Sequence, residues 1–231
     1  MDLKLIYFDL PFWRAEISRL PLFIANIEFD DFRPSDEDWD YAKENGKMKD
    51  GTIIPFRELP VLTINGESVA QTMAIARICG KLGGMYPEDI VAAGKVDQVV
   101  IAVENINALL SPSMREEDPI KKKAMRAELS ANELPTYLGY LQAIMDANNS
   151  EWFVGDDMTI ADLAVWSLLG WIASGVIDDI SSEVIRPFKG LVRLYNEINK
   201  NPRVQEWKIK TYDHEKVRTD EYSFDIPDII E

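Results

Sequence analysis

The hydrophobic positions in the first third of the chain change period several times. Residues 3–8 form a short apolar run with weak alternation, which predicts a strand. Residues 14–19 predict the start of a helix, although Pro21 falls one or two turns into it. Residues 27–32 alternate with period two and predict a second strand. Residues 34–51 are charged and rich in turn signals, so we expect a long exposed excursion there.

The clearest local pattern lies at residues 59–69. Two apolar runs flank Asn65-Gly66, and this dipeptide supplies both positive-φ positions of a type I′ turn, so the pattern predicts a β-hairpin. From Gln71 onward, apolar residues recur at helical spacing until Gly83-Gly84, which predicts a helix. The first third of the chain is therefore expected to be a small α/β unit with mixed strand directions.

From Pro87 onward the apolar period is helical. Four segments show it, with prolines between them: 89–114, 119–147, 159–176 and 187–199. Thr159 and Asp162 precede an apolar run at the spacing of a capping box, in which each side chain satisfies a free N–H group of the other's backbone. We therefore expect an α+β domain followed by an all-α domain.

This pattern divides the chain into two domains and a tail. We expect the α+β domain over residues 1–82, a linker over 83–90, the all-helical domain over 91–210 and an acidic tail over 211–231. The tail holds seven acidic residues against two basic ones and few apolar residues, so we expect partial order at best.

Composition narrows the possible partners. The chain has 231 residues, 46% of them hydrophobic, and its formal net charge of −15 repels nucleic acid phosphates and anionic membranes. No apolar run approaches the roughly 20 residues that span a bilayer. The charged Asp2 and Lys4 stand where a signal peptide is apolar. We expect a cytoplasmic protein that binds neither nucleic acid nor membrane.

Cysteine and histidine occur once each. A disulfide framework, a Cys-x-x-Cys pair and a thiolate zinc site each need at least two cysteines, and the sequence has only Cys79, so we expect no such metal site. The single histidine, His214, lies in the acidic tail, where a solvated side chain is more typical than a catalytic one.

Several short motifs, taken in order and spacing, resemble those of a known family. They are Tyr7-Phe8, Arg14-Ala15-Glu16, Glu58-Leu59-Pro60-Val61-Leu62, Gln71-Thr72-Met73-Ala74-Ile75-Ala76-Arg77 and the Thr159-x-x-Asp162 box. Together they resemble a cytosolic glutathione transferase, closest to the sigma-like, tyrosine-type classes, over about residues 3 to 208. The resemblance implies a thioredoxin-like domain that binds glutathione, an all-helical domain and a homodimer. It also implies that reduced glutathione is the cosubstrate and that no metal is needed.

The resemblance implies catalytic roles for Tyr7 and Arg14. A free thiol titrates near about 8.5, so little of it is thiolate at neutral pH, and a hydroxyl that donates to sulfur favours the anion. Tyr7 is the implied donor, and Arg14 steadies it. From the sequence alone, a core tyrosine and a surface pairing of Arg14 with Glu16 or Glu58 stay open.

Four further residues are implied to hold the peptide part of glutathione. Leu59-Pro60 resembles the site where a cis-proline turns the preceding backbone toward the cysteinyl unit, while an ordinary trans proline is the alternative. Gln71 and Thr72 resemble the pair that binds the γ-glutamyl carboxylate at a helix N-terminus. The alternative for Thr72 is a plain helix cap.

Trp39 and Lys43 resemble the residues that hold the glycyl end of glutathione. The segment 44–58 is several residues longer than the family pattern, so Lys47 and Lys49 are alternatives to Lys43.

Two residues depart from the family pattern in charge. Glu58 stands where a lysine is common and places a negative charge near an anionic ligand. Asn105 stands where the partner subunit is expected to supply an aspartate, and the adjacent Glu104 is a possible substitute.

An apolar set is expected to contact the electrophile. Its members are Phe12, Trp13, Leu110 and Met114, with Trp171 as a further candidate. Each of these is more typical of a core when taken singly. Phe12-Trp13 is the exception, because two adjacent aromatics in a loop leave at least one partly exposed.

The favoured function is conjugation of glutathione to small hydrophobic electrophiles. One alternative is a glutathione-dependent isomerase similar to prostaglandin D synthase, which differs only in the apolar pocket. Another is a noncatalytic relative similar to a crystallin, which Glu58, Asn105 and the acidic tail favour. The presence of Tyr7 and Arg14 favours an enzyme.

Overall fold

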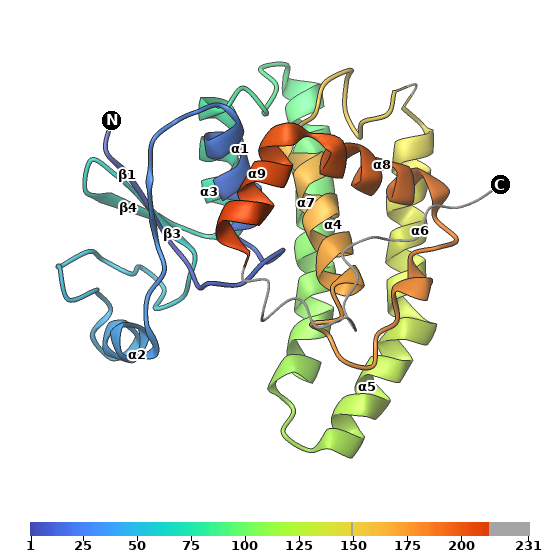
Figure 1. The fold of residues 1–231 in the computed structure, drawn as a ribbon, viewed down its shortest axis with the longest axis horizontal. Helices are drawn as coiled ribbons and strands as arrows, with labels where there is room; N and C mark the ends of the chain where they lie inside the picture. The colour runs from blue at the N-terminus through green and yellow to red at the C-terminus, as the bar shows by residue number, and fades with distance from the viewer. Residues whose placement is uncertain (149, 213–231) are drawn as a thin grey trace.

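A small sheet domain lies beside a larger helical domain in the computed structural model, which describes residues 1–148 and 150–212 (Figure 1). The elements of the first domain are β1 (Leu3–Ile6), α1 (Glu16–Ile24), β2 (Asp30–Phe32), α2 (Asp36–Asn45), β3 (Val61–Ile64), β4 (Glu67–Ala70) and α3 (Thr72–Leu82). The elements of the second are α4 (Ile90–Arg115), α5 (Pro119–Ala131), α6 (Glu133–Asp146), α7 (Ile160–Ala173), a 3-10 turn (Ser182–Val184), α8 (Lys189–Lys200) and α9 (Pro202–Thr211). The prediction of an α+β unit followed by helices is confirmed.

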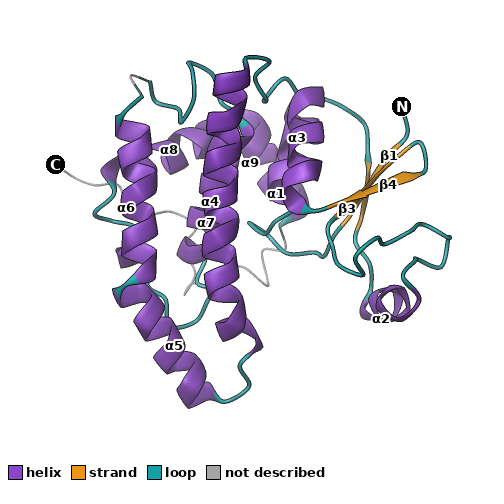
Figure 2. Ribbon diagram, turned by 180° about the vertical axis from the view of Figure 1, so that it is seen from behind, coloured by secondary structure: helices purple, strands orange, loops and turns teal. Residues whose placement is uncertain are grey.

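The sheet has the strand order β2-β1-β3-β4, with β1 parallel to β2 and antiparallel to β3. Its two faces bury alternate residues of β1. Leu5 packs with residues of α1 and α3, while Ile6 packs with Ala42 of α2 on the opposite face. The predicted hairpin is confirmed, with φ of 51° at Asn65 and 87° at Gly66. β1 therefore ends inside a three-layer arrangement, with helices on both sides of it (Figure 2).

Three expectations about the helices are corrected. The exposed excursion at 34–51 contains α2, because Ser35 accepts a hydrogen bond from the Asp38 N–H at 3.2 Å and Gly46 ends the helix at φ 70°. The expected helix 119–147 is two helices, which meet at Asn132. α9 was not expected, because the helical periodicity ends at residue 199; Pro202, which follows it, occupies the first turn of a further helix. Residues 213–231, including His214, lie outside the described residues.

α7 is the centre of the helical domain, and all of its residues are buried. The predicted capping box begins it: Asp162 accepts from the Thr159 N–H at 2.7 Å, and Thr159 accepts from the Ala161 N–H at 3.2 Å. Among the described residues, no helix combines the length and the apolar character needed to cross a bilayer.

The loop after β1 fastens the two domains together. Phe12 has a φ of 57°, which turns its ring away from the sheet and onto α7, where it lies 4.9 Å from the ring of Trp166. The Ser167 hydroxyl donates to the Phe12 carbonyl at 2.8 Å. A methyl group at Gly170 would overlap the Phe12 ring, so the close approach requires glycine.

Substitution of Gly170 therefore tests the domain contact. Gly170→Ala is expected to lower the free energy of unfolding by about 1–3 kcal/mol, because the added methyl group overpacks the Phe12 contact. Gly94→Ala is the control, since Gly94 lies in α4 with nothing within 4 Å of an added Cβ, and alanine there is expected to stabilise by about 0.5–1 kcal/mol. Urea unfolding of both variants measures the difference. Equal midpoints for the two variants would contradict the contact.

Candidate functional site

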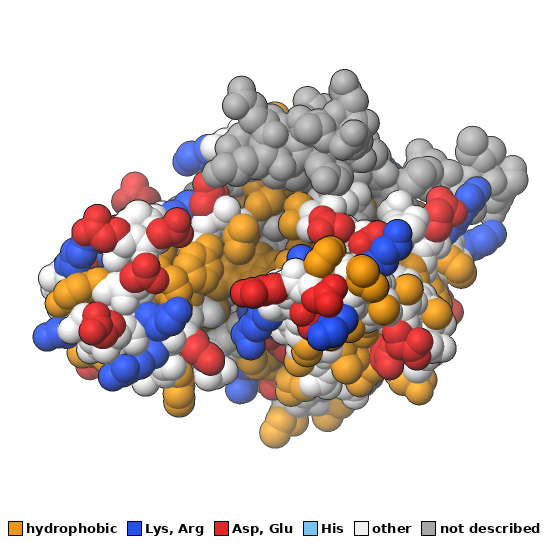
Figure 3. Space-filling view, turned by 90° about the horizontal axis from the view of Figure 1, so that it is seen from below, with side chains coloured by type: hydrophobic (Ala, Val, Ile, Leu, Met, Phe, Trp, Pro, Cys, Tyr) orange, Lys and Arg blue, Asp and Glu red, His pale blue; other side chains and the backbone are white. Residues whose placement is uncertain are grey.

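A cleft of about 480 Å³ opens between the sheet domain and the helical domain. Eight of the predicted site residues line it: Tyr7, Trp13, Arg14, Trp39, Leu59, Pro60, Gln71 and Thr72. Hydrophobic side chains gather in the hollow between the domains, as Figure 3 shows. The cleft thus lies where β1, β3 and α3 present their ends to α4.

Tyr7 directly follows β1, and its N–H donates to the Phe32 carbonyl at 3.1 Å. The residue is 2% exposed, although it lines the cleft. Burial raises the pKa of the Tyr7 phenol well above its ordinary value, the nearby Arg14 cation opposes this rise, and Glu104 adds to it. A phenol is protonated at neutral pH even at its ordinary pKa, and the net rise moves Tyr7 further from ionisation, so its hydroxyl is available as a hydrogen-bond donor.

Arg14 joins the cleft to the helical domain. Its Nε donates to Glu104 Oε2 of α4 at 3.1 Å, so the expected alternatives, pairing with Glu16 or with Glu58, are wrong. Glu104 also accepts from Asn107 at 2.9 Å. The pair fixes Arg14 beside the Tyr7 ring, where its charge favours a bound anion. A partner 90 residues away could not be chosen from sequence spacing.

On the side of the cleft formed by residues 59–60 and 71–72, the backbone conformation is unusual at two positions. The Leu59-Pro60 bond is cis, as the resemblance implied and against the trans alternative. Gln71 takes φ 79°, outside the usual region for a residue with a side chain, and directly precedes α3. Among residues 1–148 and 150–212, no side chain caps this helix, so the alternative of Thr72 as its cap is wrong. The amino end of α3 meets the cleft with N–H groups that no described side chain caps, an arrangement suited to a carboxylate.

α2 brings Trp39 to the cleft, where its ring meets that of Phe8 edge-on at 5.4 Å. Lys43 lies one turn further along α2, is exposed and does not line the cleft. Lys49 is committed to Glu37 at 2.8 Å and Asp38 at 3.1 Å. Lys47 is exposed. Of the three lysines, Lys49 is therefore the least available to a ligand.

Glu58 and Asn105, whose charges differ from the family pattern, lie differently with respect to the cleft. Glu58 is exposed and lines the cleft, so its carboxylate does lie near the place where an anionic ligand would bind. Asn105 is exposed on α4, next to Glu104, and does not line the cleft within this chain.

Of the apolar residues expected to contact the electrophile, only Trp13 lines this cleft. Trp13 is half-buried, lines the cleft and packs edge-on against Trp171 at 3.9 Å. Phe12 and Leu110 are buried in the helical core and do not line this cleft, and the positive φ of Phe12 turns its ring inward. Met114 is half-buried, does not line the cleft, and its sulfur accepts from Arg126 at 3.1 Å.

The cleft-lining residues that the sequence did not single out include Leu10, Phe56 and Arg115. Leu10 and Phe56 are 41% and 61% exposed, and the exposed Arg115 ends α4 at the same cleft. Single apolar or basic residues in loops and helix ends carry no periodicity, so only the fold brings these three together.

The chain is similar in sequence and in fold to known proteins. The family model for the glutathione S-transferase C-terminal domain matches residues 104–211. Glutathione S-transferase 2 of Manduca sexta is 31% identical over 145 residues, 63% of this chain and 67% of that one. Hematopoietic prostaglandin D synthase of Gallus gallus is 26% identical over 88% of this chain and 94% of that one. The crystal structure of the glutathione S-transferase from Ascaris lumbricoides superposes with a TM-score of 0.78 at 25% identity, covering 92% of this chain and 98% of that one.

Cys79 offers a test of the site's chemistry. It is fully buried, and burial raises the pKa of its thiol to about 12, so it is expected to be inert in the folded protein. Titration with a chromogenic disulfide should label no thiol of the native chain and one thiol per chain in denaturant. Rapid labelling of the native protein would contradict the buried position and would assign a reactive thiol to the protein itself.

Proposed function

Because this chain belongs to the glutathione S-transferase family, we propose that it binds reduced glutathione in the cleft at Tyr7 and conjugates the thiol to small hydrophobic electrophiles. The observation that carries the proposal is the Tyr7 phenol. It is a protonated donor whose pKa burial raises further, and it stands next to Arg14 at the wall of a cleft between the domains.

The proposed mechanism uses Tyr7 as a donor. The phenol donates its hydrogen bond to the glutathione sulfur and stabilises the thiolate, whose proton passes to solvent. The Arg14 cation, held by Glu104, adds a favourable field. The thiolate then attacks the electrophilic atom, and a carbon–sulfur bond forms as a leaving group departs or a double bond is saturated. Tyr7 keeps its proton throughout.

The remaining wall would orient the tripeptide. In this proposal the Leu59 backbone pairs with the cysteinyl unit, and the free N-terminus of α3 with Gln71 and Thr72 receives the γ-glutamyl carboxylate. We assign the glycyl end to Trp39, which lines the cleft, and to Lys43, whose exposed side chain would reach the ligand from outside the cleft lining. We also propose a cytoplasmic homodimer, in which Asn105 of a second copy reaches the ligand.

Trp13, Leu10 and Phe56 give the electrophile an apolar wall. Isomerisation is a second candidate, supported by the similarity to a hematopoietic prostaglandin D synthase. It uses the same thiolate and differs in the fate of the substrate. The noncatalytic alternative is supported by Glu58, Asn105 and the acidic tail and is opposed by the assembled Tyr7–Arg14 wall.

Removal of one hydroxyl tests the mechanism. Tyr7→Phe is expected to keep glutathione binding, seen by isothermal titration, and to lose about 10- to 1000-fold in kcat/KM, because a single stabilising donor is lost. Tyr140→Phe is the control, since Tyr140 is 62% exposed on the surface of α6. Turnover of Tyr7→Phe at the wild-type rate would refute the role of Tyr7. Failure of the wild-type chain to bind glutathione would favour the noncatalytic alternative.

A further inference from the structure

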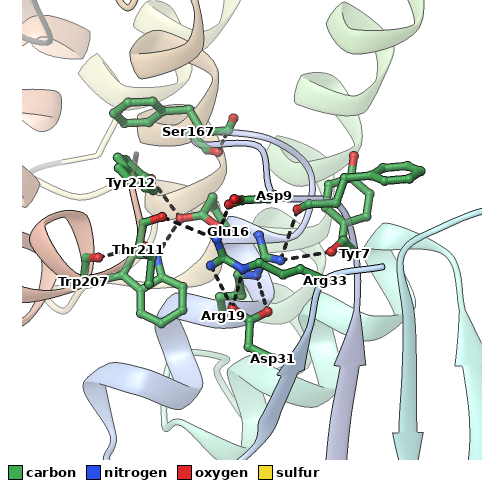
Figure 4. Close-up of polar contacts among 12 residues, drawn as sticks. Tyr7, Asp9, Glu16, Arg19, Asp31, Arg33, Ser167, Trp207, Thr211 and Tyr212 are labelled. Carbon is green, nitrogen blue, oxygen red and sulfur yellow. Dashed lines mark hydrogen bonds and ion pairs between the residues drawn. The ribbon is translucent and has the colours of Figure 1, made fainter. Parts of the chain in front are cut away.

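A buried cluster of charges lies behind Tyr7 and takes no part in the proposed chemistry. Glu16 and Arg19 of α1 are each 1% exposed. Arg19 Nη1 donates to Glu16 Oε1 at 3.1 Å, and Arg19 Nε donates to Asp31 Oδ1 at 2.8 Å (Figure 4). Buried ion pairs are often no more stabilising than well-packed apolar residues, so they are weak evidence for stability alone. The directions in which these side chains donate indicate another use.

Arg19 holds the backbone of the residue that carries the phenol. Its Nη2 donates to the carbonyl oxygens of Tyr7 at 3.4 Å and Phe8 at 3.3 Å. The Tyr7 N–H is already bonded to Phe32, so the backbone of Tyr7 is tied on both sides. The guanidinium also lies 5.9 Å from the centre of the Tyr7 ring. Arg19, like Arg14, lowers the pKa of this phenol by its charge, whereas Glu104 raises it.

Glu16, in turn, is held by the helical domain. Its second oxygen, Oε2, accepts from Trp207 Nε1 at 2.7 Å and from the Tyr212 hydroxyl at 2.8 Å. Both donors are buried, at 3% and 5% exposure. Burial, reinforced by Glu16, keeps the pKa of the Tyr212 phenol well above its ordinary value, so this group remains a donor. A chain of contacts therefore runs from the end of α9 through Glu16 and Arg19 to Tyr7.

We propose that Glu16 and Arg19 are positioning residues for the Tyr7 phenol, and that Trp207 of α9 and Tyr212, which directly follows α9, set their position. The proposal rests on the proposed function, because the positioned phenol acts on bound glutathione. If Glu16 loses one donor, a buried carboxylate oxygen is left short of a partner, and Glu16 and Arg19 shift to recover it. Small displacements of a donor weaken its bond to the reacting atom. The thiol of bound glutathione then ionises less readily.

Tyr212→Phe tests this with the mildest available change, and Tyr86→Phe is its matched control. The Tyr86 hydroxyl also donates to a carboxylate at 2.8 Å, that of Asp97, and Tyr86 is 7% exposed, but it does not line the cleft or contact Tyr7. Both changes remove one phenol oxygen that donates to a carboxylate, in a buried contact at Tyr212 and in a part-buried contact at Tyr86. A purely structural role for Tyr212 predicts the same outcome for both variants.

Two readouts are measured on the full chain with bound glutathione: the pH profile of kcat/KM, and the ultraviolet absorbance of the thiolate as pH is varied. Tyr212→Phe is expected to raise the apparent pKa of the bound thiol by about 0.5–1 unit and to lower kcat/KM at mildly acidic pH about 3- to 10-fold. Tyr86→Phe is expected to leave the apparent pKa unchanged. Trp207→Phe removes the other donor to Glu16 and is expected to shift the pKa in the same direction, so it decides the question if Tyr212→Phe does not fold.

An apparent pKa in Tyr212→Phe and Trp207→Phe equal to that of Tyr86→Phe would overturn the positioning role. This result is distinct from failure of the proposed function, in which the wild-type chain itself would show no thiolate band with glutathione. Cys79 adds no thiolate absorbance of its own at these pH values, because burial raises the pKa of its thiol to about 12.

Discussion

The proposed thiolate chemistry depends on the buried phenol of Tyr7, which lies next to the Arg14 cation. Burial raises the pKa of Tyr7, and Arg14 works against that rise. A phenol is neutral at pH 7 even at its ordinary pKa, and burial moves Tyr7 further from ionisation. Tyr7 therefore keeps its proton, while Arg14 still favours the negative charge on sulfur. The two opposing effects on one group therefore give a neutral donor in a positive field, which is what a thiolate requires.

This balance needs both domains. The segment that includes Tyr7 and runs through α1 meets the helical domain by hydrogen bonds of different kinds: Arg14 with Glu104 at 3.1 Å, the Phe12 carbonyl with Ser167 at 2.8 Å, and Glu16 with Trp207 at 2.7 Å. Each bond is directional and adds to the close packing of Phe12 against Gly170. The sheet supplies the phenol, and the helical domain fixes the groups around it.

Features that depend on neighbouring residues followed from the sequence. The Asn65-Gly66 hairpin, the Thr159–Asp162 box and the alternation of buried residues along β1 each involve a local period or cap, and the structure agrees. Contacts across long separations did not follow. The Arg14–Glu104 pair and the inward turn of Phe12 depend on how α1 meets α4 and α7. Two local signals were misjudged: Ser35 with its acidic neighbours begins α2, and Pro202 begins α9. The same residue types occur in loops, so neither signal was decisive.

Two thiols in this system illustrate how strongly position controls reactivity. The protein's own thiol, on Cys79, is packed among apolar residues of the sheet domain, where burial raises its pKa to about 12. In the proposed site, a thiol of the same chemical type meets a phenol donor and a nearby guanidinium, which favour its anion. The difference arises from donors and charges placed by the fold rather than from the sulfur. Because the Cys79 thiol stays protonated and buried, it does not compete with the thiolate of bound glutathione for the electrophile. The specificity of the reaction then follows from which sulfur reaches the cleft.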